Sequence, residues 1–157
     1  MGSGKTTLGK RLSNKLNVQF FDLDAEIEKT ENLSVNEIFE KHGETYFRDI
    51  EVKVLEAIIE NNESFVMSLG GGTPCYYNNM ELINQSGVSI YIKYNSGILT
   101  SRLLNVKKQR PLIKDFNDQE LKTFIVNKLN ERELFYAQSK FVVEKNNVRV
   151  EDILFLL

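Results

Sequence analysis

A glycine-rich segment at the start of the chain has the residue types of a phosphate-binding loop. Gly2-Ser3-Gly4-Lys5-Thr6-Thr7 matches the second half of the Walker A pattern, G-x-x-x-x-G-K-[ST]. Glycines allow backbone N–H groups to surround phosphate oxygens, and a helix starting at Lys5 would point its positive end at the same anion. The pattern predicts that these six residues bind ATP, that Lys5 reaches the β- and γ-phosphates, and that the Thr6 hydroxyl ligates Mg²⁺. A glycine-rich tail that precedes Lys-Thr by chance is the alternative.

Two aspartates come at the end of the next apolar segment. Asp22 and Asp24 belong to or directly follow the apolar run at residues 18–23. If the strand continues through them, its alternation places both carboxylates on one face, at the edge where α/β sheets bind ligands. Beside a phosphate loop, two acids in this place suit Mg²⁺ positioning and the activation of a hydroxyl nucleophile. An N-cap at Asp24 is a second interpretation, compatible with the first.

Four further segments combine charged residues with glycines or a helix end, and each alone has a purely structural explanation. Residues 43–51 would form a charged helical face, residues 68–72 a loop, and Arg132 a cation that caps a helix. The polar stretch at residues 105–118 is long enough to be a mobile lid. The segments read G-E-T-Y-F-R-D-I-E (43–51), S-L-G-G-G (68–72), Q-R-P-L (109–112) and R-E-L-F-Y (132–136).

Composition restricts the class of protein. The chain has 157 residues, 41% of them hydrophobic and 27% charged, so we expect one domain over residues 1–157. A net charge of −2 argues against a nucleic-acid binder. One cysteine, Cys75, excludes an internal disulfide, and one histidine, His42, excludes a His-rich metal site. The longest apolar run, residues 153–157, is too short to span a bilayer, and no signal peptide opens the sequence, so we expect no membrane partner and a cytoplasmic location.

The elements that must hold these residues alternate between strands and helices. Near-continuous apolar runs at residues 18–23, 65–69, 88–94 and 141–143 predict strands buried on both faces of a parallel sheet. Helical patterns occupy residues 6–16, a segment opened by a capping box at Ser34, residues 44–61, and a segment behind an expected cap at Asp118. The sequence therefore predicts an α/β fold with a mainly parallel sheet.

Taken together, the motifs resemble those of the shikimate kinase family of small-molecule P-loop kinases. That family has G-x-G-K-[ST]-[ST], D-x-D, G-E-x-x-F-R-x-x-E, G-G-G, R-P-L and R-x-P-x-Y in this order, and the resemblance covers residues 1 to about 143. It implies a three-layer α/β/α sandwich with a five-stranded parallel sheet in the order 2-3-1-4-5 and a lid at about residues 105–117. It also implies a monomer that uses ATP and Mg²⁺ to phosphorylate the 3-hydroxyl of shikimate, giving 3-phosphoshikimate and ADP.

The resemblance also implies roles for individual residues. The catalytic residues would be Lys5, Asp24 and Arg110. Asp24 would contact the hydroxyl that is phosphorylated, and Arg110 would be the lid arginine that reaches the ATP phosphates. Arg48 and Arg132 would bind the shikimate carboxylate. Gly71 and Gly72 would approach the ring through backbone, and Asp22 would lie near the Mg²⁺. The chain departs from the family pattern at Leu134, where proline is usual, and at Leu69, where threonine is common.

The phosphate loop is incomplete in this sequence. Its first glycine would precede Met1, and the strand that should feed the loop is absent. We expect the natural chain to begin roughly ten residues earlier with an apolar strand. We expect either that upstream strand or a gap at the centre of the sheet, beside the strands of Asp22 and Ser68. Those two strands should not hydrogen-bond directly to each other.

Two other classes of function remain as alternatives. One is another small P-loop kinase, such as a gluconate or nucleoside monophosphate kinase. The other is a non-catalytic nucleotide-binding module or a domain that acts on nucleic acid. The presence of Lys5, Thr6, Asp24 and Arg110 argues against an inactive enzyme, and the net charge of −2 argues against nucleic acid.

Overall fold

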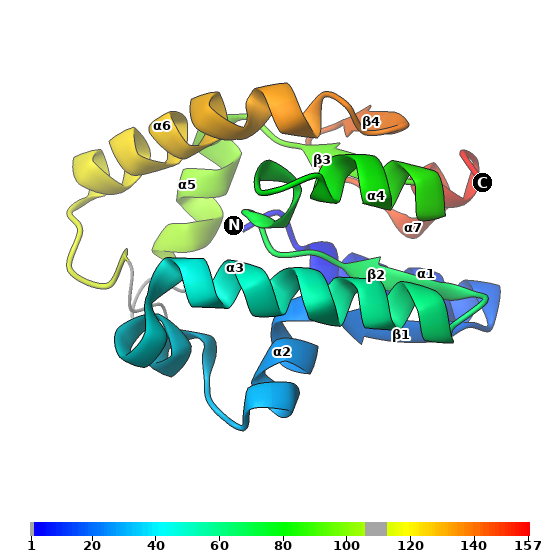
Figure 1. Cartoon of the computed structure of the whole chain (residues 1–157). Coiled ribbons are helices and arrows are strands. Elements are labelled where there is room, and N and C mark those ends of the chain that lie inside the picture. The colour runs from blue at the N-terminus through cyan, green and yellow to red at the C-terminus, as the bar shows by residue number, and fades with distance from the viewer. Residues whose placement is uncertain (1, 106–112) are drawn as a thin grey trace. The chain divides into compact units, whose positions relative to one another are not determined.

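Helices and short parallel strands make up both parts of the chain (Figure 1). The computed structural model describes residues 2–105 and 113–157. Contacts between residues divide the chain into two units, which we call the N-terminal unit (residues 5–87) and the C-terminal unit (residues 1–4 and 88–157). No helix among the described residues is both long enough and apolar enough to cross a membrane.

The N-terminal unit contains two strands that pair directly in parallel. The register sets Gln19 opposite Phe65 and Asp22 opposite Ser68. Its elements, in order, are α1 (Lys5–Leu16), β1 (Gln19–Asp22), α2 (Leu23–Glu31), α3 (Val35–Asn61), β2 (Phe65–Ser68), the 3₁₀ helix η1 (Thr73–Cys75) and α4 (Asn79–Ser86).

Helices cover both faces of this strand pair. Successive strand residues point to opposite faces, and Phe20 and Phe21 do so here. The Phe20 ring lies against Gly9 of α1, 2.7 Å from the position a Cβ would take there. Phe21 packs on the other face, in a core cluster with Val54 and Ile58 of α3. The order α1, sheet, α3 agrees, in this unit, with the three-layer arrangement that the family resemblance implies.

Helix α3 joins two segments whose patterns we identified separately. The capping box at Ser34 is confirmed: its hydroxyl accepts from the N–H of Glu37, and the Glu37 side chain accepts from the N–H of Ser34. A break at Gly43, with φ of +83°, separates this first segment from the longer one. Glycine adopts such a φ readily, and the change of direction there precedes Glu44 and Arg48.

The C-terminal unit holds a second pair of parallel strands, with Ile90 opposite Phe141 and Lys93 opposite Glu144. Helix α6 begins with a capping box formed by Asn117 and Glu120, so the expected cap at Asp118 is wrong by one residue. The elements are β3 (Ile90–Lys93), α5 (Ser96–Leu104), α6 (Asp118–Tyr136), β4 (Phe141–Glu144) and α7 (Val150–Leu154).

Two expectations about the strands are wrong. The strands of Asp22 and Ser68 bond directly to each other, although we expected no direct pairing. In the order 2-3-1-4-5, strands 2 and 3 are neighbours, and these correspond to β1 and β2. The direct pairing therefore contradicts the expectation of no contact between these two strands, but not the strand order itself. Burial on both faces fails for β4, where Phe141 and Val142 are exposed. The described residues form four strands in two separate pairs.

Candidate active site

The glycine loop leads directly into α1. Gly2 and Gly4 both have positive φ, +72° and +77°, which side-chain-bearing residues rarely adopt. The carbonyl of Ser3 accepts a hydrogen bond from Arg102 Nη1 at 3.3 Å, within the C-terminal unit. Lys5 opens α1, so the free backbone N–H groups of the first helical turn follow the glycines, as a phosphate site requires.

Oxygen atoms from three elements meet behind this first turn. Thr6 Oγ1 donates to Asp22 Oδ2 at 2.8 Å and lies 3.3 Å from the hydroxyl oxygen of Ser68. Asp22 ends β1 and Ser68 ends β2, so their parallel pairing brings both to one edge of the sheet. A hydroxyl beside a carboxylate is a donor set that suits Mg²⁺, which completes its shell with water and substrate phosphates. The described residues contain no group of three or more His, Cys, Asp or Glu side chains that could hold a metal by themselves.

Asp24 lies in the first turn of α2, not on the strand. The argument from strand alternation is therefore wrong for Asp24, because the backbone becomes helical at Leu23. The N-cap position belongs to Asp22, whose side chain makes no capping hydrogen bond. Burial raises the pKa of Asp24 above its usual value of 3.8, the charge of Lys5 opposes this rise, and the charges of Asp22 and Glu28 add to it. Asp24 is thus a half-buried carboxyl with an increased affinity for a proton.

Arg48 lies in the centre of a buried polar network on α3. Its Nη1 donates to Glu51 Oε2 at 2.7 Å, and Thr73 Oγ1 donates to the other oxygen of Glu51 at 2.6 Å. Asn79 Nδ2 in turn donates to the Thr73 carbonyl at 2.9 Å. All four side chains are buried, and Thr73 is 0% exposed. This network fixes one side of the guanidinium group.

The other side of the Arg48 guanidinium faces more exposed groups. Nη2 donates to Glu44 Oε1 at 3.1 Å, and the Tyr76 hydroxyl donates to the same oxygen at 2.7 Å. The Tyr76 ring lies 4.0 Å from the guanidinium carbon. Burial alone lowers the pKa of Arg48, but the hydrogen bonds and charge of its glutamate partners outweigh burial and raise it. Arg48 therefore stays charged.

The triple glycine connects Asp24 with the Arg48 network. A Cβ at Gly70 would lie 2.9 Å from Thr73 Oγ1, 3.0 Å from Asp24 Oδ1 and 3.2 Å from Glu51 Oε1. A Cβ at Gly72 would lie 2.7 Å from Arg48 Nη2. The loop after β2 therefore brings backbone close to two of the predicted site residues, Asp24 and Arg48, at positions where any side chain would collide.

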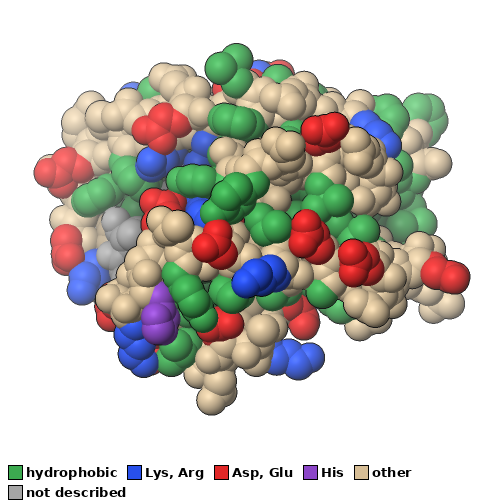
Figure 2. All heavy atoms as spheres, viewed as in Figure 1, with side chains coloured by type: hydrophobic (Ala, Val, Ile, Leu, Met, Phe, Trp, Pro, Cys, Tyr) green, Lys and Arg blue, Asp and Glu red, His purple; other side chains and the backbone are tan. Residues whose placement is uncertain are grey.

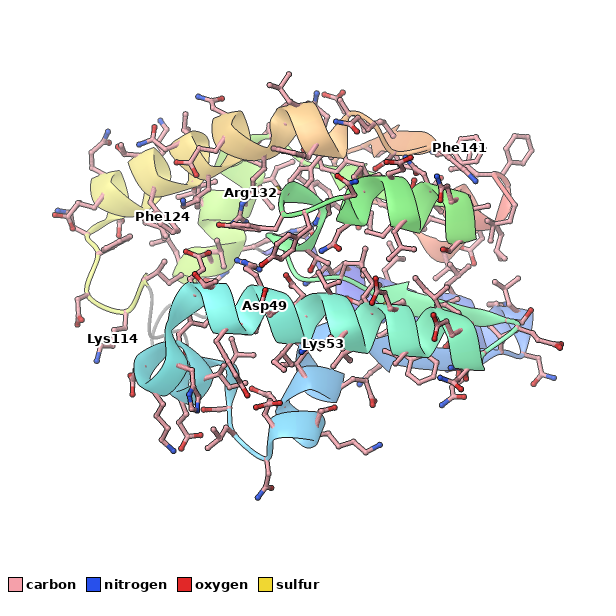
Figure 3. All side chains as sticks on the ribbon, viewed as in Figure 1. Asp49, Lys53, Lys114, Phe124, Arg132 and Phe141 are labelled. Atoms are coloured by element: carbon pink, nitrogen blue, oxygen red, sulfur yellow. The ribbon has the colours of Figure 1, made fainter. Side chains whose placement is uncertain are left out.

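The remaining predicted residues belong to the C-terminal unit. Arg132 is half-buried on α6, where Figure 3 labels it. Its neighbour Glu133 accepts from the Tyr91 hydroxyl at 3.1 Å and from Lys93 Nζ at 2.8 Å, which ties this end of α6 to β3. Arg110 lies outside the described residues, as do residues 106–112 of the expected lid.

Sequence reasoning missed several members of the network. Ser68 and Gly70 belong to the segment at residues 68–72, but its pattern predicted no role for them. Glu51 was predicted only to form an ion pair with Arg48 on the surface of a helix. Thr73 and Asn79 gave no signal at all, because a lone threonine or asparagine has no characteristic pattern. Figure 2 shows acidic and basic side chains interspersed over the visible face, in keeping with the small net charge of −2.

A glycine loop that opens a helix, with a threonine hydroxyl and an aspartate together at the edge of a parallel strand pair, is typical of an α/β P-loop kinase. The family model for shikimate kinase matches residues 1–155. The chain belongs to the shikimate kinase family. It is accordingly an ATP-dependent kinase.

Individual relatives agree with this membership. A shikimate kinase of Azobacteroides pseudotrichonymphae is 47% identical over 154 residues, which are 98% of this chain and 91% of the relative. The crystal structure of shikimate kinase from Bacteroides thetaiotaomicron superposes with a TM-score of 0.91 at 36% identity, covering 99% of this chain and 91% of that one. A shikimate kinase from Acinetobacter baumannii in complex with shikimate has a TM-score of 0.83 at 30% identity, covering 98% and 83%.

Proposed function

We propose that Asp24 is the base when this enzyme transfers the γ-phosphoryl group of ATP to the 3-hydroxyl of shikimate, giving 3-phosphoshikimate and ADP. The supporting observation is the place of Asp24, half-buried at the edge of the triple glycine, where its Oδ1 lies 3.0 Å from a Cβ built on Gly70. A raised pKa brings a carboxylate closer to the operating pH of an enzyme and makes it a better proton acceptor.

The proposed step moves one proton and breaks one phosphorus–oxygen bond. Asp24 accepts the proton of the 3-hydroxyl while that oxygen forms a bond to the γ-phosphorus, and the bond to the bridging oxygen of ADP breaks. Such transfers depend on positioning and on stabilisation of negative charge. Lys5 supplies a cation for the phosphates, and its charge also acts on Asp24.

The nucleotide would bind along residues 2–7, with phosphates at the start of α1. Thr6 and Asp22 would hold Mg²⁺, because their oxygens lie together at 2.8 Å and at the end of a strand. When bound, Mg²⁺ neutralises charge on the phosphate oxygens. We also propose that Arg110 acts on the transferring phosphoryl group from a lid at about residues 105–117.

Shikimate would bind through its carboxylate and its ring. We propose Arg48 and Arg132 for the carboxylate, because planar guanidinium forks match carboxylate geometry. Gly71 and Gly72 would approach the ring through backbone. The relative from A. baumannii was solved with shikimate and covers most of this chain, which supports the assignment of the ligand.

Finer features of the family fold remain proposals. In the order 2-3-1-4-5, the second strand pairs with the third and the fourth with the fifth, and the pairs β1–β2 and β3–β4 are compatible with this order. We propose the same order here, in one kinase domain over residues 1–157 that acts as a monomer. Since the reaction consumes ATP, we propose the cytoplasm as its location.

A coupled assay of ADP release tests the proposed acceptor. The full chain is mixed with ATP and Mg²⁺, and shikimate, gluconate and nucleoside monophosphates are compared in parallel. We expect turnover with shikimate to exceed turnover with the others by at least about 10³-fold, since a site built for polar groups rejects ligands that leave those groups unpaired. Equal or faster turnover with gluconate or a nucleotide would refute the proposal.

A further inference from the structure

Arg48 has two carboxylate partners that differ strongly in exposure. The side chain of Glu51 is 1% exposed, whereas the side chain of Glu44 is 54% exposed. The two distances differ in the same sense, 2.7 Å for Glu51 and 3.1 Å for Glu44. Ion pairs open to solvent contribute little to stability, while breaking a buried pair is costly. Glu51 is thus the buried partner of Arg48, and Glu44 is the solvent-exposed one.

The buried pair has further support from a buried hydroxyl. Thr73 donates to the second oxygen of Glu51 at 2.6 Å, so both oxygens of that carboxylate are hydrogen-bonded below the protein surface. Arg48 Nη2 and the Tyr76 hydroxyl, by contrast, both donate to the same oxygen of Glu44, Oε1. Its contact with Arg48 is monodentate.

On the guanidinium edge that faces Glu44, only one of the two nitrogens has a hydrogen-bond partner among the described residues. Nε and Nη2 of an arginine lie on one edge of its plane, where a carboxylate can accept from both at once. Nη2 of Arg48 donates to Glu44, but Nε is buried and has no hydrogen-bond partner among the residues that the structure describes. A buried polar group without a partner is unfavourable. A carboxylate in bidentate contact with this edge would satisfy both nitrogens.

We propose that Glu44 is an internal competitor that holds the Nε–Nη2 edge of Arg48 until the carboxylate of the substrate displaces it. The proposal rests on the proposed role of Arg48 in binding that carboxylate. With Glu44 and Glu51 in place, two negative charges surround one guanidinium, so a third carboxylate binds only after one of them leaves. Glu44 is the exposed one, so its carboxylate can turn to water, whereas Glu51 cannot. Substrate binding is therefore an exchange of carboxylates.

Isothermal titration of the full chain with shikimate tests the exchange. Glu44→Gln removes the competing charge, and we expect the Kd for shikimate to fall about two- to fivefold, the usual range for an exposed ion pair. Glu44→Asp keeps the charge but is one methylene too short to reach Nη2, and we expect a similar fall. Glu56→Gln, an exposed glutamate on the same helix, is the control for net charge and should leave the Kd unchanged.

Each other result overturns the proposal. A higher Kd for Glu44→Gln would make Glu44 a support for Arg48, and an unchanged Kd would make it a bystander. A lower Kd for Glu44→Gln but not for Glu44→Asp would mean that only long-range charge acts. Arg48→Met tests the role of Arg48 separately from that of Glu44. If this variant binds shikimate as tightly as the unmodified chain, Arg48 does not bind the carboxylate, and Glu44 has nothing to compete for.

Discussion

Replacing Thr73 with valine removes one hydroxyl from the buried network while keeping nearly the same shape. The lost bond to Glu51 Oε1 is 2.6 Å long, and its partners are 0% and 1% exposed, so water cannot replace it. A hydrogen bond to a charged group contributes about 1.5–3 kcal/mol. We expect the free energy of unfolding to fall by about 2–3 kcal/mol. At about 2.1 cal/mol/K per residue, this lowers the Tm of the 157-residue chain by roughly 6–9 °C.

The same change should weaken substrate binding without affecting the nucleotide. Glu51 would lose one of its two hydrogen bonds, and the orientation of Arg48 that it sets would become looser. We expect the KM for shikimate to rise roughly fivefold, equivalent to about 1 kcal/mol, with the KM for ATP unchanged.

Urea unfolding and steady-state kinetics on the same preparations measure both effects. Thr73→Ser is the matched control, because it keeps the hydroxyl and should retain most of the stability and the original KM. If valine and serine destabilise the chain equally, the hydroxyl has no special role and the reasoning about the buried network is refuted.

Three further predictions concern Arg132, Asp24 and Gly70. Arg132→Ala should weaken shikimate binding by about 1.5–3 kcal/mol for a lost charge-assisted contact and leave ATP binding nearly unchanged in titrations, whereas equal losses would indicate a structural role. Because the folded state raises the pKa of Asp24, ionised Asp24 destabilises the fold at neutral pH, and this cost disappears as pH falls toward the usual value of 3.8. Asp24→Asn should therefore melt higher than the unmodified chain at pH 8, with a gap that narrows on acidification; a constant gap would argue against the raised pKa. Gly70→Ala should lower the free energy of unfolding by about 1–3 kcal/mol, since its Cβ would lie 2.9 Å from Thr73 Oγ1, and unchanged urea unfolding would contradict that packing.

Local patterns predicted the parts of the fold that depend on neighbours in the sequence. The strand positions were correct to within two residues at each end, and the capping box at Ser34 was identified with its partner, because hydrophobic runs and caps are read from adjacent residues. The phosphate loop was predicted for the same reason, since its glycines and Lys5 are contiguous. The position of Asp24 was not, because the point where a strand becomes a helix depends on tertiary packing.

The polar network shows where sequence reasoning ends. The hydrogen bond from Thr73 to Glu51 joins residues 22 positions apart, and its place depends on how η1 packs against α3. Neither residue type marks such a pairing. The Arg48–Glu51 contact could be predicted from helical spacing, but its burial could not.

The most direct test of the mechanism is the turnover of Asp24→Asn at saturating ATP and shikimate. Asparagine has the same shape but cannot accept a proton usefully, so the fold and ATP binding should remain while turnover falls by roughly 10²–10⁴, the usual range for one acid–base group. Both variants are measured across a Mg²⁺ titration. Asp22→Asn should instead need a higher Mg²⁺ concentration, because Asp22 accepts a hydrogen bond from Thr6 and is proposed to hold the metal with it. If Asp24→Asn retains more than about a third of the original turnover, well above the loss expected for a general base, Asp24 only positions the substrate and is not the base.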